Sequence, residues 1–232
     1  MENFNISYIF RLPNNNMKVI ELQFDAETFD LLNDIPEKLP SWVELDFYQC
    51  PNCLLPTQTH SYCPVAAHLS SLLELFERLM SYDEVYVDIV TPQRIFSKKA
   101  SAQKAISSLM GLVIASSGCP HTRFFRPMAV RFHMPFTDVE ETIYRAASMY
   151  LLAQYFHQKM GHEIDLELRG LKDIYFNIQT INAALVERLR AISNKDVAIN
   201  ALVILDAFAK MVPLGIDESL EEIKYLFKPY FV

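Results

Sequence analysis

The residues of this chain that are best suited to chemistry are its four cysteines, Cys50, Cys53, Cys63 and Cys119. The first two form a Cys-Pro-Asn-Cys motif, and such a turn directs two sulfurs toward one point. Each of the other two precedes a proline, so we expect a helix or turn to begin there, with backbone N–H groups that favour a thiolate. Tetrahedral zinc takes four such ligands. We therefore predict a zinc site at these four residues, with an iron-sulfur cluster as the alternative cofactor.

The fourth metal ligand stays open at this point. Cys119 would complete a closed set of four thiolates, which leaves no coordination position for a substrate. His60, His68 or His121 in its place would give three cysteines and one histidine. The competing interpretation is that the thiols are ordinary reduced cysteines of a core.

A second cluster follows Cys119 and contains Arg123, Arg126, Arg131 and His133. Guanidinium groups match a carboxylate or a phosphate in bidentate fashion, so these residues are candidates for an anion site. In an acidic chain the arginines can instead pair with carboxylates such as Glu140. A histidine between Phe and Met is also typical of a hydrogen-bonded core.

Two further groups of polar residues lie on the expected helices. Glu141 and Arg145 are one turn apart, so they either line a polar cleft or form a simple i,i+4 pair. Asn182, Asn200 and Asp206 lie among apolar positions. Because buried polar groups need partners, we expect them to join helices through hydrogen bonds rather than to carry chemistry.

Composition and missing motifs exclude several classes of protein. A net charge of -7 disfavours a nucleic-acid platform, because phosphates require a concentrated basic face. Only 5 glycines are present and none forms a phosphate-binding loop. No Ser-His-Asp order and no His-Glu-x-x-His motif is found. The sequence therefore does not assign the protein to an enzyme class.

The N-terminus and the apolar stretches bear on location. No basic segment followed by an apolar run opens the sequence, which predicts a cytoplasmic protein. The stretches Leu109–Ala115 and Ala198–Phe208 are shorter than the ~20 residues of a membrane span, so we predict none. In a reducing compartment the cysteines are better interpreted as metal ligands or catalytic thiols than as disulfides.

The elements that would position these residues begin with a sheet. Alternating apolar residues predict a hairpin, a strand that leads into Cys50, and two strands after a helix that begins at Cys63-Pro64. The predicted strands are Asn5–Leu12, Lys18–Phe24, Trp42–Tyr48 and Val85–Val90, the last continuing at Ile95 and Phe96, and a short helix is predicted at Ala26–Asn33.

The second half of the chain has helical periodicity. Predicted helices cover residues 103–116, 138–160, 171–192, 196–212 and 219–227, with ends marked by Gly118, Gly161, Ser193-Asn194, Pro213 to Gly215, and Pro229. This order predicts an α+β fold in which a small antiparallel sheet in the N-terminal part packs against a C-terminal helical bundle. We expect a single domain over residues 1–232, with most cysteines in the sheet-containing part (1–100) and a helical part at 101–232.

Five motifs carry a resemblance to a known family. They are Cys-Pro-Asn-Cys, Tyr-Cys-Pro-Val-Ala, Ser-Gly-Cys-Pro-His, Arg-Phe-His-Met-Pro-Phe and the helical segment from Arg145 to Phe156. With them, most of the chain resembles an uncharacterised bacterial protein family, a domain of unknown function. The resemblance implies a bacterial source and carries over no activity or ligand.

Two functions follow as hypotheses. The first is a cytoplasmic binding or regulatory module with a structural zinc site and an unknown protein or small-molecule partner, without nucleic acid or membrane. The second is an enzyme or sensor that uses a reactive cysteine or an Arg/His anion pocket in the loop at residues 119–133. Assembly into a homo-oligomer is compatible with both.

Overall fold

A four-stranded antiparallel sheet forms the N-terminal side of the protein, in the order β2-β1-β3-β4. The computed structural model describes residues 2–13, 16–192, 196–218 and 220–231. The strands are β1 (Phe4–Arg11), β2 (Met17–Phe24), β3 (Glu84–Val90) and β4 (Ile95–Ser101). They confirm the predicted hairpin and the two later strands, while Asn14 and Asn15 of the predicted turn lie outside the described residues.

One face of this sheet is buried because apolar residues alternate along its strands. Tyr8 in β1 lies opposite Ile20 in β2 and Ile89 in β3, and all three are buried. The residues between them face outward, where Arg11 pairs with Asp88 at 2.5 Å.

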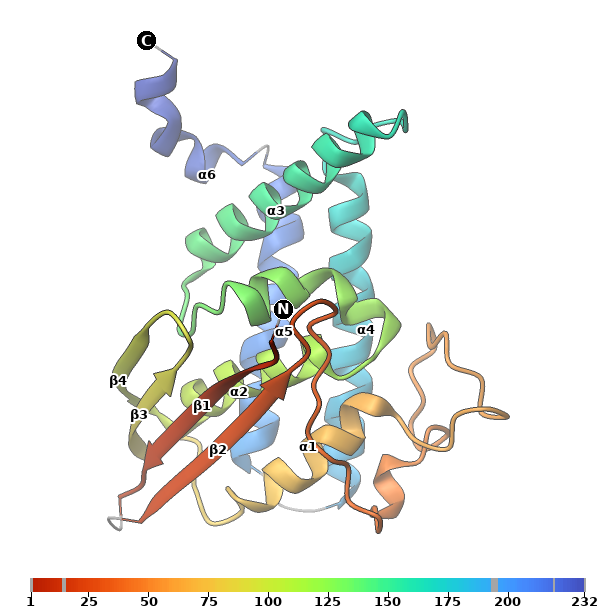
Figure 1. Ribbon diagram of the computed structural model, residues 1–232, viewed down its shortest axis with the longest axis vertical. Helices are drawn as coiled ribbons and strands as arrows, with labels where there is room; N and C mark the ends of the chain where they lie inside the picture. Colours follow the sequence, from red (N-terminus) through yellow and green to blue (C-terminus); the bar gives the residue numbers. More distant parts are fainter. Residues whose placement is uncertain (1, 14–15, 193–195, 219, 232) are drawn as a thin grey trace.

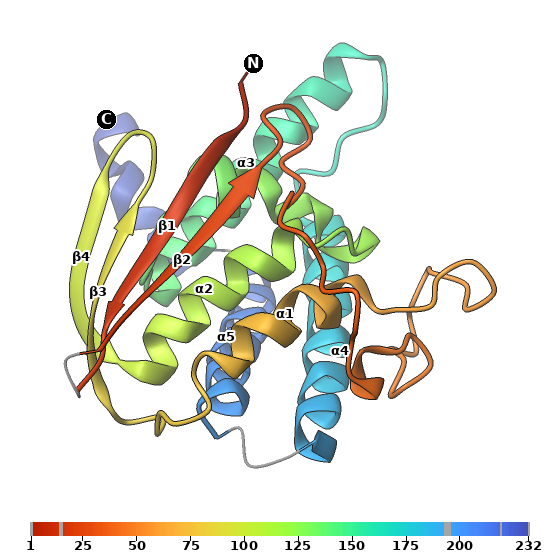
Figure 2. The same cartoon turned by 60° about the horizontal axis from the view of Figure 1, so that its bottom comes forward.

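Helices cover the buried face in layers (Figures 1 and 2). The α-helices are α1 (Pro64–Glu74), α2 (Ala102–Ser116), α3 (Val139–Lys159), α4 (Arg169–Ile192), α5 (Asp196–Asp217) and α6 (Glu221–Lys224). Short helical turns are η1 (Ser41–Val43), η2 (Pro120–Phe125), η3 (Pro127–Arg131) and η4 (Tyr225–Tyr230). The α4 and α5 helices pack against each other, and α2 lies between α5 and the sheet. The α+β prediction is therefore confirmed.

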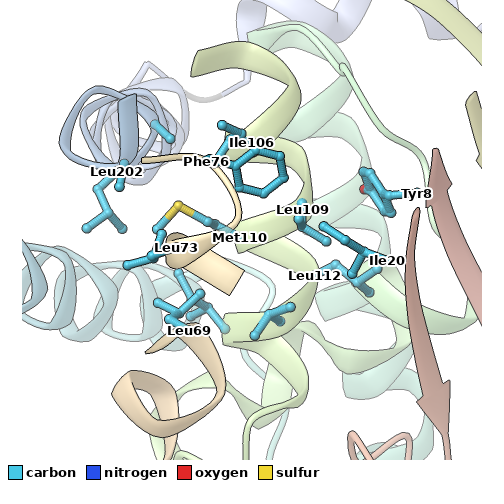
Figure 3. Packing of buried hydrophobic residues seen from close by; sticks show 14 of the residues in the cluster. Tyr8, Ile20, Leu69, Leu73, Phe76, Ile106, Leu109, Met110, Leu112 and Leu202 are labelled. Carbon is cyan, nitrogen blue, oxygen red and sulfur yellow. The ribbon is translucent and has the colours of Figure 1, made fainter. Parts of the chain in front are cut away.

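The α2 helix is the centre of the core. Eleven of its fifteen residues are buried, because it has neighbours on more than one side. Figure 3 shows Leu109 and Leu112 near Tyr8 of the sheet, while Met110 lies beside Leu73 of α1. One hydrophobic cluster thus joins strands to helices.

The predicted helix at residues 26–33 is wrong. The Asp25 carboxylate accepts hydrogen bonds from the backbone N–H groups of Glu27 (2.9 Å) and Thr28 (2.7 Å), which fixes a turn. Leu31 then forms a β-bridge with Phe24. Local side-chain bonding therefore replaces the helix.

The predicted strand at Trp42–Tyr48 is also wrong, because the segment forms η1 followed by turns. Its backbone makes one isolated antiparallel β-bridge, between Glu44 and Tyr62, and three of its carbonyl groups are taken by a side chain instead of by a strand. Arg188 of α4 donates to the carbonyl oxygens of Trp42 (2.7 Å), Glu44 (2.8 Å) and Leu45 (3.0 Å). The Cys-Pro-Asn-Cys turn is consequently reached through a compact loop.

The predicted break at Pro213 is a third error, since α5 continues to Asp217. A proline inside a helix removes the N–H that would bond to the carbonyl four residues earlier. That carbonyl belongs to Ala209, and Gln179 of α4 donates its side-chain amide to it at 3.0 Å. Gly215 serves close packing, because a Cβ there would lie 2.8 Å from Cδ1 of Ile143.

The remaining helix ends agree with the sequence more closely. Asp138 caps α3 by accepting from the Glu141 N–H at 2.8 Å, and Gly161 takes a positive φ after it. The predicted helix at 219–227 is divided into α6 and η4. Ser193 and Asn194 lie outside the described residues, as does residue 219.

The long α5 helix passes a length and composition test for a membrane span, with 39% of the tested window buried. The apolar stretch noted in the sequence, Ala198–Phe208, is only part of this helix. In the structure α5 packs against α2 and α4. Core helices of soluble proteins pass the same test.

Candidate functional site

The four cysteines come from three separate turns, all half-buried. Cys50 and Cys53 share a tight turn, closed by a hydrogen bond from the Cys53 N–H to the Cys50 carbonyl at 2.9 Å. Cys63 precedes α1 at its N-cap position, with Pro64 next, and Cys119 precedes η2 in the same way. The prediction that both lie where a helix or turn begins is confirmed.

The four thiols lie close enough to influence one another's ionisation. Burial raises the pKa of Cys50 to about 12, and the neighbouring Cys63, Cys53 and Cys119 raise it further. Burial also raises the pKa of Cys119 to about 11, opposed by hydrogen bonds from the backbone N–H groups of His121 and Thr122. Both thiols are therefore protonated at neutral pH, which makes them poor nucleophiles.

The four cysteine side chains are not arranged as a metal-ligand shell in the structure. Within the described part of the chain, no three Cys, His, Asp or Glu side chains are placed as ligands of one ion. Of the alternative ligands, His60 is exposed and contacts Thr59, and burial lowers the pKa of His68. His121 directs Nε2 at the Asn52 carbonyl, 2.6 Å away.

The cysteine region is tied to α4. The Asn52 side-chain amide donates to Oδ1 of Asn177 at 2.8 Å, which holds the Cys50–Cys53 turn against the helix. The fully buried Arg188 binds the three carbonyls before Cys50 and lowers its pKa, so its guanidinium lies near that thiol. No ion pair is formed by Arg188 among the residues that the structure describes.

The predicted anion-binding arginines have separate surroundings. Arg126 is buried and pairs with Asp30, and it also donates to the Thr28 carbonyl at 3.0 Å. Arg131 lies over the ring of Phe132 at 6.0 Å, and Arg123 is exposed. Carboxylate pairing, the competing interpretation, is thus found for Arg126, although its partner is in a loop.

His133 is a buried, hydrogen-bonded histidine. Its Nδ1 lies 2.7 Å from the Ala129 carbonyl, which only accepts, so Nδ1 carries the proton. Its Nε2 then accepts from the Tyr8 hydroxyl at 2.7 Å, and that hydroxyl also contacts Ser108 at 2.9 Å. Burial lowers the pKa of His133 to about 4, so the ring is neutral at pH 7.

A cavity of about 560 Å³ lies between α2, η2, η3, the start of α3, α4 and α5. This volume is in the range of pockets for small organic ligands. Of the four predicted anion-binding residues, His133 alone lines it. The walls are mainly apolar and include Leu112, Ile114, Phe125, Met128, Ile178, Leu205 and Phe208.

Several polar side chains also line the cavity, and three of them have hydrogen-bond donors without a partner among the described residues. Asn182 of α4 is 2% exposed, and its amide nitrogen has no hydrogen-bond partner among the described residues. Arg145 of α3 uses Nη2 for hydrogen bonds to the carbonyls of Met128 and Phe132, both at 2.7 Å. Tyr175 lies near Arg145, and burial raises its pKa. The cavity therefore holds donors whose capacity is only partly used.

The sequence contained part of this site. Asn182 was expected to join helices, whereas its amide nitrogen stays without a partner. The prediction that Asn200 and Asp206 join helices is also wrong, because Asn200 bonds to Asp196 at 2.7 Å and Asp206 pairs with Lys210 at 2.6 Å, both within α5. Asn182 among apolar helix positions, Arg145 as a candidate cleft residue and His133 as a candidate site residue were thus the signs of the cavity in the sequence.

Comparison with known proteins places the chain in a family. Residues 6–228 match the family described as a domain of unknown function, DUF6901. Searches of the curated proteins and of the solved structures return no match. Because the match covers nearly the whole sequence, the chain belongs to the DUF6901 family.

Proposed function

We propose that this protein is a small-ligand binding module whose binding site is the cavity between α2, α3, α4 and α5. The supporting observation is a buried amide, that of Asn182, without a partner in an otherwise apolar cavity. A buried polar group left unpaired costs about 1–3 kcal/mol. A ligand with a hydrogen-bond acceptor would offset that cost, and an apolar body would match the walls.

We further propose that the four cysteines hold a structural zinc ion in the cytoplasm. Buried Arg188 supports this assignment, because a cation this deep needs a negative partner and none is found among the described residues. Zinc bound by four thiolates carries net negative charge beside Cys50, where the guanidinium lies. Rearrangement of the side chains would be required to bring the sulfurs to about 2.3 Å from the ion.

Zinc would connect the two sites. Cys119 begins η2, and Thr122 and Phe125 of η2 belong to the cavity wall. An ion shared by Cys119 and the Cys50–Cys53 turn would therefore hold η2 against α4, where Asn52 already bonds to Asn177. The metal would stabilise the wall without touching the ligand.

The alternative function, an enzyme or sensor at residues 119–133, has less support. Its thiol form needs an accessible thiolate, whereas burial keeps Cys50 and Cys119 protonated at neutral pH. Its anion form needs the arginines to converge, whereas Arg126 is paired with Asp30. A binding module needs only the cavity and the partly free donors on its wall, both of which are present.

The cavity can be tested with N-phenyl-1-naphthylamine, an uncharged apolar fluorophore. We expect saturable binding that Ala209→Leu weakens at least about tenfold, because the added carbons fill space on the α5 wall. Ala115→Leu on the α2 wall is a second variant with the same expected result. Ala191→Leu, on an exposed position of α4, is the matched control and should bind as the natural chain does. Absence of binding, or equal binding by all three variants, would refute the proposal.

The metal can be tested by elemental analysis of the purified chain. We expect one zinc ion per chain, lost with a lowered Tm after Cys63→Ser, and unchanged after His60→Ala. Retention of zinc by Cys119→Ser with loss in His68→Ala or His121→Ala would assign the fourth ligand to a histidine instead. Iron and sulfide in place of zinc would indicate the cluster. A folded chain with neither metal, prepared without chelator, would contradict the assignment.

A further inference from the structure

Positive charge surrounds the cavity of this acidic chain. Lys98 and Lys104 line it and are exposed, which places them at its mouth, and Arg145 lies on its wall. Asp138 is the one carboxylate among its described lining residues, and it already caps α3 by accepting from the Glu141 N–H. The chain as a whole has a net charge of -7. The cavity therefore has an excess of positive side chains, although the chain as a whole is negatively charged.

The cation on the wall has donors to spare. Both hydrogen bonds found for Arg145 among the described residues use Nη2, which leaves Nη1 and Nε for another acceptor. Glu141 is one turn away on α3, but no ion pair joins the two side chains in the described structure. A guanidinium with free N–H groups facing a partly enclosed space is well suited to a carboxylate.

Tyr175 adds a neutral donor beside that guanidinium. Its side chain is 4% exposed and lines the cavity, and no hydrogen bond to its hydroxyl is found in the described ranges. Buried tyrosine hydroxyls usually find a partner. Arg145 and Tyr175 therefore present a charged and a neutral donor at one place on the wall, from α3 and α4.

The remaining lining of the cavity indicates what kind of molecule would carry the anionic group. His133 is neutral and both of its ring nitrogens are already engaged, so it offers no charge. Most of the remaining lining is aliphatic or aromatic. An inorganic anion would leave those walls without contacts, whereas a hydrocarbon body would cover them.

We infer that the ligand is an amphipathic organic anion, with its carboxylate at Arg145 and Tyr175, its hydrocarbon body against the apolar walls, and a further acceptor for the Asn182 amide that the proposed function already requires. Lys98 and Lys104 attract the anion at the mouth. This inference rests on the proposed binding function, because it names the ligand class of the same cavity.

Ligand class can be tested by displacement of N-phenyl-1-naphthylamine with three probes of equal chain length. Dodecanoate carries a negative charge, dodecanol is neutral and dodecyltrimethylammonium is positive, and each is used below its micelle concentration. We expect dodecanoate to displace the fluorophore at about tenfold lower concentration than dodecanol, with the cation weakest. Equal potency of the three probes would overturn the inference while leaving fluorophore binding, and thus the proposed function, intact.

Variants then test the residues. Tyr175→Phe removes one hydroxyl and should weaken dodecanoate by about five- to tenfold, with little effect on the fluorophore. Tyr144→Phe, on an exposed position of α3, is its matched control and should leave dodecanoate unchanged. An unchanged affinity in Tyr175→Phe would refute the placement of the carboxylate.

The lysines are tested as a pair. Lys98→Gln combined with Lys104→Gln should weaken dodecanoate several-fold and reduce its dependence on salt, with dodecanol unaffected. Lys38→Gln combined with Lys228→Gln makes the same change in net charge at two exposed sites away from the cavity, and should leave binding unchanged. Equal losses in both pairs would mean that overall charge, not this mouth, attracts the anion.

Discussion

The cysteine region, residues 41–63, and the cavity region, between α2, α3, α4 and α5, are held together by different means. In the cysteine region no described element is longer than η1, and its backbone is fixed by polar side chains from elsewhere, above all Arg188. The cavity region is built from long helices that pack through apolar faces. Asn182, on its wall, has no hydrogen-bond partner for its amide nitrogen among the described residues, so that amide does not hold the region together.

The difference between Arg188 and Asn182 distinguishes a polar group that stabilises the fold from one that is available to a ligand. In the cysteine region Arg188 holds three backbone carbonyl groups, so its removal should unfold that region. In the cavity region Asn182 lacks a partner, so its replacement should cost little or stabilise. The contrast predicts opposite results for substitutions of Arg188 and of Asn182.

The largest effect is expected for Arg188→Met. The substitution leaves the carbonyls of Trp42, Glu44 and Leu45 without their donor, and should lower the free energy of unfolding by about 3–5 kcal/mol. Urea denaturation of the purified variant measures this. Arg190→Met, at an exposed arginine paired with Glu187, is the control and should change it by less than about 0.5 kcal/mol. Equal effects of the two would mean that Arg188 does not fix the cysteine region.

The next effect is the pH dependence that comes from His133. Its pKa in the folded protein is about 4, against 6.5 for a free histidine, so the unfolded chain binds the proton more tightly. Stability is therefore full above pH 6.5 and falls as the pH drops toward 4, by about 3 kcal/mol. The measurement is urea denaturation across this range, with His133→Phe as the reference. If the free energy of unfolding depends on pH in the same way in the natural chain and in His133→Phe, His133 is not buried as a neutral ring.

The same contrast explains which parts of the structure could be predicted from the sequence. The alternation in β1 and the Cys63-Pro64 helix start depend on neighbouring residues, and both predictions were correct. Trp42–Tyr48 alternates equally well, but a side chain far along the sequence takes its carbonyls. The alternation of apolar residues contains no information about a distant partner such as Arg188, so the segment was predicted as a strand.

The two candidate sites differ in the same respect. The cysteines stand out because their chemistry is rare and their spacing local. The cavity is lined from seven elements spread over the chain, and most of its lining consists of ordinary apolar residues. The sequence singled out Asn182, Arg145 and His133, but nothing in it showed that these three residues line one cavity.

A smaller effect is expected at the pair formed by Gln179 and the Ala209 carbonyl. Gln179→Leu removes the one donor that replaces the N–H missing at Pro213, and should cost about 1–2 kcal/mol. In a Pro213→Ala background the new N–H can bond to that carbonyl, so the same substitution should cost much less. A double-mutant cycle by denaturation measures the difference. Equal costs in both backgrounds would show that Gln179 does not satisfy this carbonyl.

The smallest effect, and the one of opposite sign, is expected for Asn182→Leu. The variant removes a buried amide whose nitrogen has no partner among the described residues, and a leucine of similar size suits the apolar walls. Without ligand, the free energy of unfolding should rise by about 1 kcal/mol. Asn200→Leu is the control, because that amide is bonded to Asp196 and its loss should destabilise. If Asn182→Leu also destabilises, the amide is satisfied in the free protein and the distinction between the two regions is lost. If it stabilises, a polar group is being kept at the cavity against the stability of the fold, which is the behaviour expected of a ligand site.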